Sequence, residues 1–595
     1  MEYSCQLSKG QLLCTIIPDR DINDGLFCCS GMAPMQVLYG GKAIRTIGSY
    51  TEIALPPLTA NQPHLITIIY ADGHLAANRA WMPLGPYLKF GTDIIPLDSG
   101  PLGVKATPQS DLGHFDGLQI IPQPSAVALD GQTIEVRNFV SDDAAIRAAN
   151  DVFSRKGFNP CLAGNGLRIS CVAAELSKDA YRLTISPKEI TIAASNYGGR
   201  FYAGVTLMTL LQTHHGALPC GEITDTPRFD WRGQHLDTVR HFYQVDTIYE
   251  LLDLMALLKL NRFHWHFADD EAFRLQIDCY PELWKQTEVC GEGQFLPGLF
   301  AGSVKSGGSY SKQEAANIIA RAKQLNIEVM PEIEVPAHAL ALTQVFPDMR
   351  DPLDVGTETS VQGYKGNVAN PAMAKTWEVY NAIATEVGAL FPFSHLHLGC
   401  DELPKDTWMG SPKARDLMRA EGLTTTEDLQ GWTINKLAMT VSENGQRPAA
   451  WEEAAQGCNG GIGNNAILFS WTGQGPGVQA ARAGYDVVMC PAQNVYMDMA
   501  HTDDPDDWGA SWAAFVSLED TVNWDPIPEP DIADRILGVQ GAFWSEFTTE
   551  DSQLWPMLIP RILGVASQAW QQDRIARKTL VQLWASYRSL FVTNT

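Results

Sequence analysis

Eight short runs of apolar and β-branched residues, separated by segments long enough for a helix, constrain the fold of residues 226–595 most strongly. The runs span residues 229–237, 262–268, 327–335, 394–400, 447–453, 466–471, 486–496 and 536–545. Between several of them, apolar residues recur at i, i+3 and i+4, as in amphipathic helices, at 245–261, 311–326 and 374–390. Repeated strand–helix units predict an α/β fold, a closed (β/α)8 TIM barrel of ~250 residues plus insertions.

Two further regions precede the barrel. Residues 116–225 mix strand-like stretches, such as 181–195, with helix-like ones, such as 142–153, so we expect a small α/β domain there. Residues 1–115 are rich in Gly, Pro and short β-branched runs, and they predict an N-terminal β-rich domain of unknown role.

The charge balance narrows the range of partners. A formal net charge of -25 at pH 7 argues against nucleic acid and anionic membranes, which need basic patches. No stretch approaches the roughly 20 apolar residues of a membrane helix, and the N-terminus does not resemble a secretory signal, so we expect a cytoplasmic protein. The twelve cysteines lack paired CxxC spacing, which favours reduced thiols. We expect no metal and no cofactor, and the oligomeric state stays open.

Polar and aromatic residues fall where the predicted strands end, which is where a barrel carries its functional side chains. They are Arg240, Asp269, Asp270, His338, Asp401, Glu402, Trp451, Trp471, Tyr496, Asp498, Trp544 and Glu546. Taken singly, each has a structural explanation: tryptophans pack, loop acids are solvated, and a lone histidine is usually structural. Together they favour a sugar pocket, because indole faces stack on pyranose rings and hydroxyls need fixed polar partners.

Asp401 and Glu402 are adjacent at the end of the fourth run. Two neighbouring carboxylates repel each other, which pushes one of them toward the protonated form. The pair is therefore either a solvated loop or a catalytic site.

The motifs resemble glycoside hydrolase family 20, the β-N-acetylhexosaminidases. The stretch "FDWRGQHLDTVRHF" opens the resemblance, and "PEIEVPAH", "HLHLGCDE", "WEE", "VYMD", "SWAAFVSLE" and "GAFWSE" follow in the family's order. The resemblance covers residues 116–595 and includes the small domain before the barrel. It implies an enzyme that removes terminal β-linked N-acetylglucosamine or N-acetylgalactosamine from the non-reducing end of an oligosaccharide or glycoconjugate.

The resemblance also implies residue roles. Glu402 would be the general acid/base, and Asp401 would hold the 2-acetamido group of the substrate. His338 would join the hydrogen-bond network of the acids, and Tyr496 would donate to the acetamido oxygen. The remaining residues would bind or enclose the sugar: Arg240, Asp269, Glu546, Asp498, Trp451, Trp471, Trp544 and Trp512.

The resemblance further implies substrate-assisted catalysis. Most retaining glycosidases place two carboxyl groups ~5–5.5 Å apart across the bond, whereas adjacent side chains on a strand point to opposite faces. In the substrate-assisted route the acetamido oxygen attacks the anomeric carbon and forms an oxazolinium ion. Glu402 would be protonated at rest, its pKa raised by burial and by its neighbour, and Asp401 would be ionised.

Three residues depart from the family pattern: Ala337 and Cys400, where glycine is usual, and Gln568, where an acid is common. Cys400 lies beside Asp401, so we expect thiol modification to inhibit the enzyme. Two alternatives remain. One is the same chemistry with a specialised exo-specificity, disaccharide-releasing or for a modified sugar, set by loops such as 458–465 and 501–511. The other is a sugar-binding barrel without turnover, which the presence of Glu402 and Tyr496 disfavours.

Overall fold

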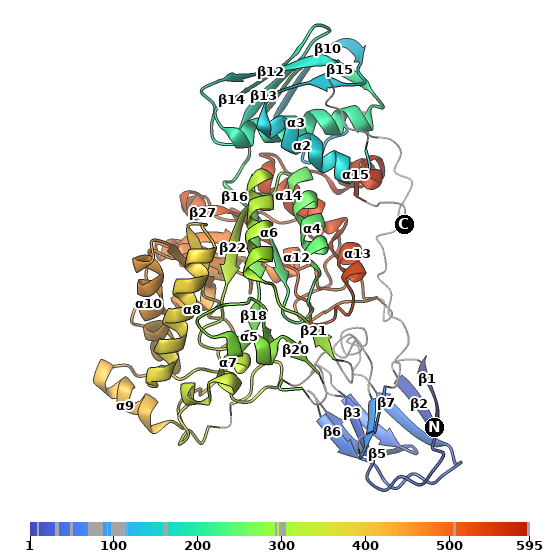
Figure 1. Ribbon diagram of the computed structural model, residues 1–595, viewed down its shortest axis with the longest axis vertical. Coiled ribbons are helices and arrows are strands. Elements are labelled where there is room, and N and C mark those ends of the chain that lie inside the picture. The colour runs from blue at the N-terminus through green and yellow to red at the C-terminus, as the bar shows by residue number, and fades with distance from the viewer. Residues whose placement is uncertain are drawn as a thin grey trace.

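The computed structural model describes residues 1–8, 11–29, 35–47, 51–69, 87–91, 93–96, 115, 117–158, 165–291, 294–296, 305–356, 358–503 and 507–591. Residues 504–506 of the loop expected to influence specificity lie outside this description. Figure 1 shows the barrel in the middle, the small α/β domain above it and the N-terminal strands below it.

Eight parallel strands close the barrel, as the sequence predicts. In order around the barrel they are β16 (Trp231–Asp237), β17 (Arg262–His266), β22 (Glu328–Glu332), β23 (His395–His397), β24 (Arg447–Trp451), β25 (Ile467–Ser470), β26 (Asp486–Met489) and β27 (Ile536–Gly541). Every residue of β16 and β17 is buried, as expected for strands covered on both faces.

All eight strands are shorter than the runs that predicted them, and two differ most. The run at 394–400 forms a strand only over His395–His397, because Gly399 and Cys400 take left-handed backbone angles that leave the extended conformation. The run at 486–496 ends as a strand at Met489, and α12 (Ala492–Val495) follows it.

Helices and short hairpins surround the barrel. The longest helices are α4 (Val245–Leu257), α6 (Lys312–Gln324), α8 (Ala374–Leu390), α10 (Thr426–Glu443) and α15 (Arg577–Phe591). Shorter ones are α5 (Pro281–Thr287), α7 (Leu340–Val345), α9 (Pro412–Glu421), α11 (Gln474–Arg482), α13 (Leu554–Leu558) and α14 (Arg561–Trp570). The small strands are β18 (Ala268–Asp269), β19 (Ala272–Phe273), β20 (Val289–Cys290) and β21 (Ser306–Gly307). The 3-10 helices are η1 (Pro347–Met349), η2 (Glu452–Ala455), η3 (Pro530–Arg535) and η4 (Asp551–Gln553).

The small α/β domain is a six-stranded sheet in the order β10-β15-β13-β14-β12-β11. Its elements are β10 (Ala126–Glu135), β11 (Phe139–Val140), α2 (Ala144–Arg155), β12 (Leu167–Ala173), β13 (Tyr181–Ile185), β14 (Ile190–Ala194), α3 (Tyr197–Thr213) and β15 (Ala217–Asp225). Figure 1 shows α2 and α3 between this sheet and the barrel, which explains why most of α3 is buried.

The N-terminal region is β-rich, as predicted. Two antiparallel sheets, β1-β2-β7-β4-β5 and β6-β3-β8-β9, share one hydrophobic core that includes Leu12, Phe27, Val37, Ile66 and Tyr87. The strands are β1 (Glu2–Ser8), β2 (Gln11–Ile17), β3 (Leu26–Cys29), β4 (Met35–Tyr39), β5 (Lys42–Ile47), β6 (Thr51–Ala54), β7 (His64–Ile69), β8 (Tyr87–Phe90) and β9 (Asp93–Pro96).

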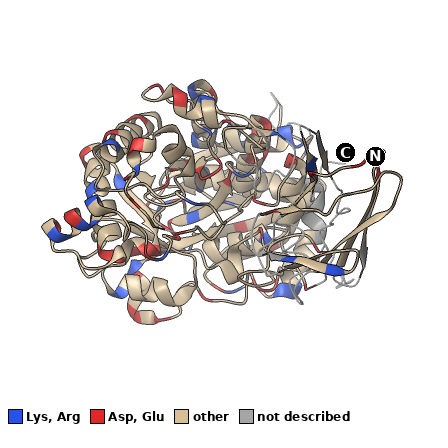
Figure 2. Ribbon diagram, turned by 90° about the horizontal axis from the view of Figure 1, so that it is seen from below, with Lys and Arg blue, Asp and Glu red and all other residues tan. Residues whose placement is uncertain are grey.

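The described surface carries acidic and basic residues interspersed over the helices around the barrel (Figure 2). Within the described ranges, no helix is both long and apolar enough to cross a lipid bilayer.

A buried ion pair joins the small domain to the barrel. Lys259, which follows α4, places its Nζ 2.7 Å from Asp225 Oδ2 at the end of β15. Tyr181 Oη and Trp570 Nε1 also donate hydrogen bonds to the Asp225 carboxylate, each over 2.8 Å. The side chains of Lys259 and Asp225 are 1% and 0% exposed, so each charge depends on the other for its stability.

We expect Lys259→Met to lower the free energy of unfolding by about 3–5 kcal/mol, because it leaves a buried carboxylate without its cation. The double variant Lys259→Met with Asp225→Asn should lose less, since neither charge remains. Urea unfolding of both variants measures this, with Arg482→Met at an exposed ion pair as the control. A single variant as stable as the native chain would contradict the assignment.

Candidate active site

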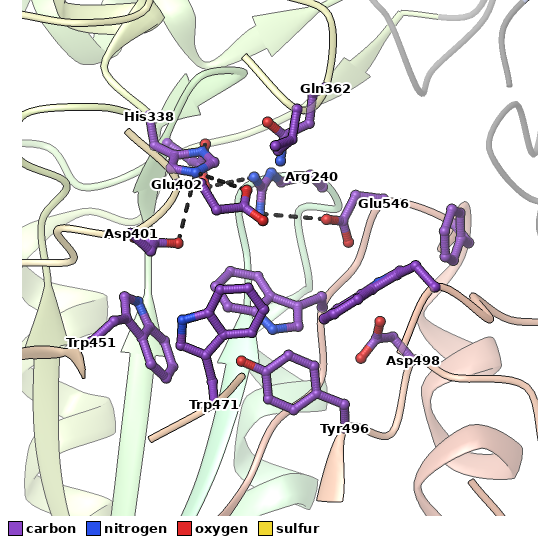
Figure 3. Close-up of a pocket in the computed structure, with 15 residues that line it drawn as sticks. Arg240, His338, Gln362, Asp401, Glu402, Trp451, Trp471, Tyr496, Asp498 and Glu546 are labelled. Carbon is purple, nitrogen blue, oxygen red and sulfur yellow. Dashed lines mark hydrogen bonds and ion pairs between the residues drawn. The ribbon is translucent and has the colours of Figure 1, made fainter. Parts of the chain in front are cut away.

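A pocket of about 240 Å³ opens at the carboxyl end of the barrel strands (Figure 3). The structure brings together every residue assigned to the site from the sequence except Asp270. The lining includes Arg240, Asp269, His338, Asp401, Glu402, Trp451, Trp471, Tyr496, Asp498, Trp512, Trp544 and Glu546. Asp270 is buried beside the pocket, where its carboxylate accepts hydrogen bonds from the Leu340 backbone and the Asn367 side chain.

The two adjacent acids lie beyond β23 rather than on it. Gly399, Cys400 and Glu402 have φ angles of +62°, +80° and +51°. For a residue other than glycine this conformation costs roughly 1–2 kcal/mol, so the surrounding structure must hold the turn in place. The expectation that the two side chains point to opposite faces is therefore wrong: strand alternation does not apply, and both carboxyls line one pocket.

One imidazole contacts both acids. His338 Nε2 lies 3.4 Å from Glu402 Oε2 and 3.7 Å from Asp401 Oδ2 (Figure 3). Its Nδ1 lies 3.0 Å from Asp269 Oδ1, which accepts a hydrogen bond and so fixes the proton on Nδ1. The remaining nitrogen, Nε2, therefore faces the acids and can exchange a proton with Glu402.

Asp401 and Glu402 differ in how deeply their side chains are buried. Burial raises the pKa of Asp401 to about 6, and the charge of Glu402 adds to this while His338 opposes it. The Asp401 side chain is 11% exposed, whereas that of Glu402 is 26% exposed and opens toward the pocket. The sequence placed deep burial on Glu402; in the structure Asp401 is the more deeply buried of the two side chains.

Arg240 neutralises a group of acids at the base of the pocket. Its Nη2 lies 2.7 Å from Asp269 Oδ2, its Nε donates to Glu271 Oε2 over 2.8 Å, and its Nη1 lies 3.8 Å from Glu546 Oε1. Asp237 Oδ2 accepts a further hydrogen bond from Nη1. The guanidinium is thus fixed, and its partner Glu546 keeps an oxygen without a hydrogen bond, Oε2, for a ligand.

Aromatic side chains form the walls. Trp471 stacks on Tyr496 with ring centroids 6.3 Å apart, and both meet Trp512 edge-on. Trp471 Nε1 donates to Glu453, and its backbone N–H donates to Glu452, so this wall is fixed from behind. Trp512 is 43% exposed and stands at the mouth. Flat apolar walls of this kind suit the C–H faces of a sugar ring or an acyl methyl group.

Several buried polar atoms at the pocket lack a hydrogen-bond partner in the described structure. They are Asp401 Oδ1, Asp498 Oδ1, Glu546 Oε2, Gln362 Oε1, His338 Nε2 and Trp451 Nε1. Unpaired buried polar groups are costly, so their concentration here indicates partners supplied by a ligand or by water. Most are acceptors, which matches a ligand with several hydroxyl and amide donors.

Sequence reasoning missed several residues. Val361, Gln362 and Phe547 also line the pocket. Gln362 comes from the segment between η1 and α8, far from any strand end, so the barrel rule could not find it. Asp237 and Glu271, which contact Arg240, were also missed. Both are acids near predicted strand ends, so the same rule could have found them.

The three departures from the family pattern are all buried. Cys400 is 1% exposed, its thiol accepts a hydrogen bond from Gln430, and burial raises its pKa well above the usual range. Reactive cysteines are exposed and readily ionised, so the structure argues against inhibition through this thiol. Ala337 packs against Trp408 in a small apolar cluster, and the Gln568 amide donates to the backbone oxygens of Val522 and Trp524.

Histidines and acids beneath the pocket also resemble a metal site. Glu332 lies 2.6 Å from His266 Nδ1 and 2.7 Å from His397 Nδ1. Ligand atoms of one tetrahedral zinc ion lie roughly 3.4 Å apart, given bond lengths of 2.0–2.2 Å. These atoms are closer than that, so the side chains contact one another directly.

Comparisons with known proteins agree with this geometry. The family profile "Glycosyl hydrolase family 20, catalytic domain" matches residues 229–573, and "Glycosyl hydrolase family 20, domain 2" matches residues 117–226. A β-hexosaminidase of Vibrio furnissii is 32% identical over 84% of each chain. A β-N-acetylhexosaminidase of Cellulomonas fimi is 30% identical over 68% of this chain and 78% of its own.

Solved structures extend the similarity to the N-terminal region. The exo β-N-acetylglucosaminidase of Vibrio harveyi, in complex with N-acetylglucosamine, matches with a TM-score of 0.85 at 26% identity. The match covers 99% of this chain and 97% of the other. The described N-terminal strands, which the motifs left unmatched, are therefore part of a shared architecture.

We expect Asp401→Asn to stabilise the fold at neutral pH. An acid whose pKa is raised to about 6 on folding destabilises the folded state as it ionises. The penalty is absent below its unfolded pKa and complete above its folded one, where it amounts to roughly 3 kcal/mol. Urea unfolding at pH 7.5 should show the gain, and at pH 4 most of it should vanish. An equal change in the free energy of unfolding at both pH values would contradict the prediction. Asp348→Asn, at an exposed acid, is the control and should change the stability little.

Proposed function

This chain belongs to glycosyl hydrolase family 20, and from that premise we propose that it removes terminal β-linked N-acetylglucosamine from oligosaccharides. The observation that carries the proposal is the contact of one histidine nitrogen with two adjacent acids, Asp401 and Glu402. The ligating atoms of these three side chains lie within 4.8 Å of one another. This is closer than the ≈ 6.5–9.5 Å of an inverting pair, and both acids line the same pocket.

Glu402 acts as the general acid and then as the general base. It protonates the leaving oxygen while the substrate's acetamido oxygen attacks the anomeric carbon and forms an oxazolinium ion. Water then attacks the same carbon and breaks its bond to the acetamido oxygen, Glu402 takes a proton from the water, and the configuration is retained. His338 Nε2, 3.4 Å from Glu402, exchanges protons with it and keeps it oriented between the two steps.

Asp401 stabilises the positive charge that develops on the acetamide. Its pKa of about 6 leaves it mostly ionised at neutral pH, and its unpartnered Oδ1 is free to accept the acetamide N–H. A carboxylate in a buried site interacts strongly with a nearby cation, so most of its effect falls on the transition state. Tyr496 holds the acetamido oxygen from the opposite side, and Trp471 and Trp544 enclose the acyl methyl.

Support for N-acetylglucosamine comes from the relatives. The Vibrio harveyi structure contains N-acetylglucosamine, and another Vibrio harveyi relative, 28% identical over 67% of this chain, is named N,N'-diacetylchitobiase. The acceptors Glu546 and Asp498 and the donor Arg240 give the hydroxyls of one terminal sugar fixed partners.

The test compares the nitrophenyl β-N-acetylglucosaminide with the plain β-glucoside. We expect turnover of the acetamido sugar only, and Glu402→Gln should lower kcat by about 10²–10⁴-fold. Glu443→Gln, at an exposed acid on α10, is the matched control and should have native activity.

Two other outcomes would contradict the proposal in different ways. Comparable cleavage of both sugars would mean that a protein carboxylate is the nucleophile. Binding of N-acetylglucosamine without turnover of either substrate would instead identify a sugar-binding barrel.

A further inference from the structure

A continuous chain of contacts runs from the centre of the barrel to the catalytic acid. Glu332 Oε2 lies 2.6 Å from His266 Nδ1, and His266 Nε2 lies 2.9 Å from Asp269 Oδ2. Asp269 Oδ1 then lies 3.0 Å from His338 Nδ1, whose Nε2 lies 3.4 Å from Glu402. Each member is buried except Glu402, which faces the pocket.

His266 must carry a positive charge in this arrangement. Both of its ring nitrogens face carboxylate oxygens at hydrogen-bond distance, and only the imidazolium form can donate from both. Burial alone would lower its pKa, but Glu332 and Asp269 raise the pKa to about 10.

His264, on the same strand and beside the same glutamate, has the opposite state. Its Nδ1 accepts a hydrogen bond from the Gln540 amide, whose oxygen is in turn held by Trp231 Nε1. An acceptor nitrogen carries no proton, so His264 is neutral, and burial lowers its pKa to about 4. Its other nitrogen lies 3.1 Å from Glu332 and has no contact with Asp269 in the described structure.

We propose that His266, held charged by Glu332, is a positioning residue that keeps the catalytic proton on Glu402. This rests on the function proposed above. Asp269 attracts the proton of His338, and a stronger attraction would make His338 more basic at the expense of Glu402. The His266 cation on the other side of Asp269 weakens this attraction, as Arg240 does. Burial lowers the pKa of His338, whereas Asp269 and Asp401 raise it well above its usual value. The His266 cation limits this rise and so favours a proton on the acid that faces the substrate.

Other titratable groups lie next to His266 and His338 and affect the charge of both. Glu334 Oε1 lies 3.8 Å from His266, and burial, followed by repulsion from Asp401, raises the pKa of Glu334 well above the usual range. The His235 ring lies 5.6 Å from His266, and burial lowers the pKa of His235. Around His338 the neighbours are Asp269, Asp270, Asp401 and Glu402.

The test is the pH profile of kcat/KM for the nitrophenyl acetamido sugar. His266→Gln removes the cation, so His338 should become more basic and Glu402 should lose its proton at lower pH. The alkaline limb of the kcat/KM profile should therefore shift to lower pH by about one unit. The matched control is His264→Gln, which alters the same strand and the same glutamate but not the path to Asp269. Its limb should stay at the native position.

A limb that stays in place in His266→Gln, or that moves equally in both variants, would overturn the proposal. Spectra of ¹⁵N-labelled histidine give a second readout that needs neither activity nor a folded His266 variant. In His338→Gln, the buried His266 ring should still carry a proton on both nitrogens at pH 9. Spectra without such a doubly protonated ring would also overturn the proposal. If the native chain turns over no acetamido sugar, the proposed function fails, and the spectra still test the charge of His266.

Discussion

Compensation of buried negative charge by a few buried cations is the constraint on which the catalytic end of the barrel depends. Asp237, Asp269, Glu271 and Glu546 surround the single guanidinium of Arg240. An unpaired charge in such a site costs several kcal/mol, so each carboxylate must find a cation or take up a proton. His266, whose two ring nitrogens both face carboxylates, supplies further positive charge. The side chains that bind and cleave the substrate are therefore held in place by the same contacts that make the site stable.

The catalytic turn illustrates what this arrangement costs. His338, Cys400 and Glu402 all have positive φ angles although none is glycine. Burial also raises the pKa of Asp401, so its ionised form is less stable than in water. Such strain persists where the surrounding fold determines the conformation. Here it lets two neighbouring carboxyls face the same pocket, which an extended strand would prevent.

Much of this was predictable from the sequence. Periodicity located the eight barrel strands, and the rule that function lies at strand ends found the acids and the tryptophans. The family resemblance added the roles of Asp401 and Glu402. Three features were not predictable for physical reasons: Gln362 lies in a loop, the left-handed turn depends on tertiary contacts, and the burial that distinguishes Asp401 from Glu402 depends on the packed pocket.

The central claim is that the nucleophile belongs to the substrate, so the most direct measurement varies that nucleophile. Nitrophenyl β-glucosaminides with acetyl, fluoroacetyl, difluoroacetyl and trifluoroacetyl groups on the nitrogen differ chiefly in the electron density of the carbonyl oxygen. The account predicts that kcat falls steeply and regularly with each added fluorine, since a poorer nucleophile closes the oxazolinium ring more slowly. Equal rates along the series would contradict it and would assign the attack to a carboxylate of the protein.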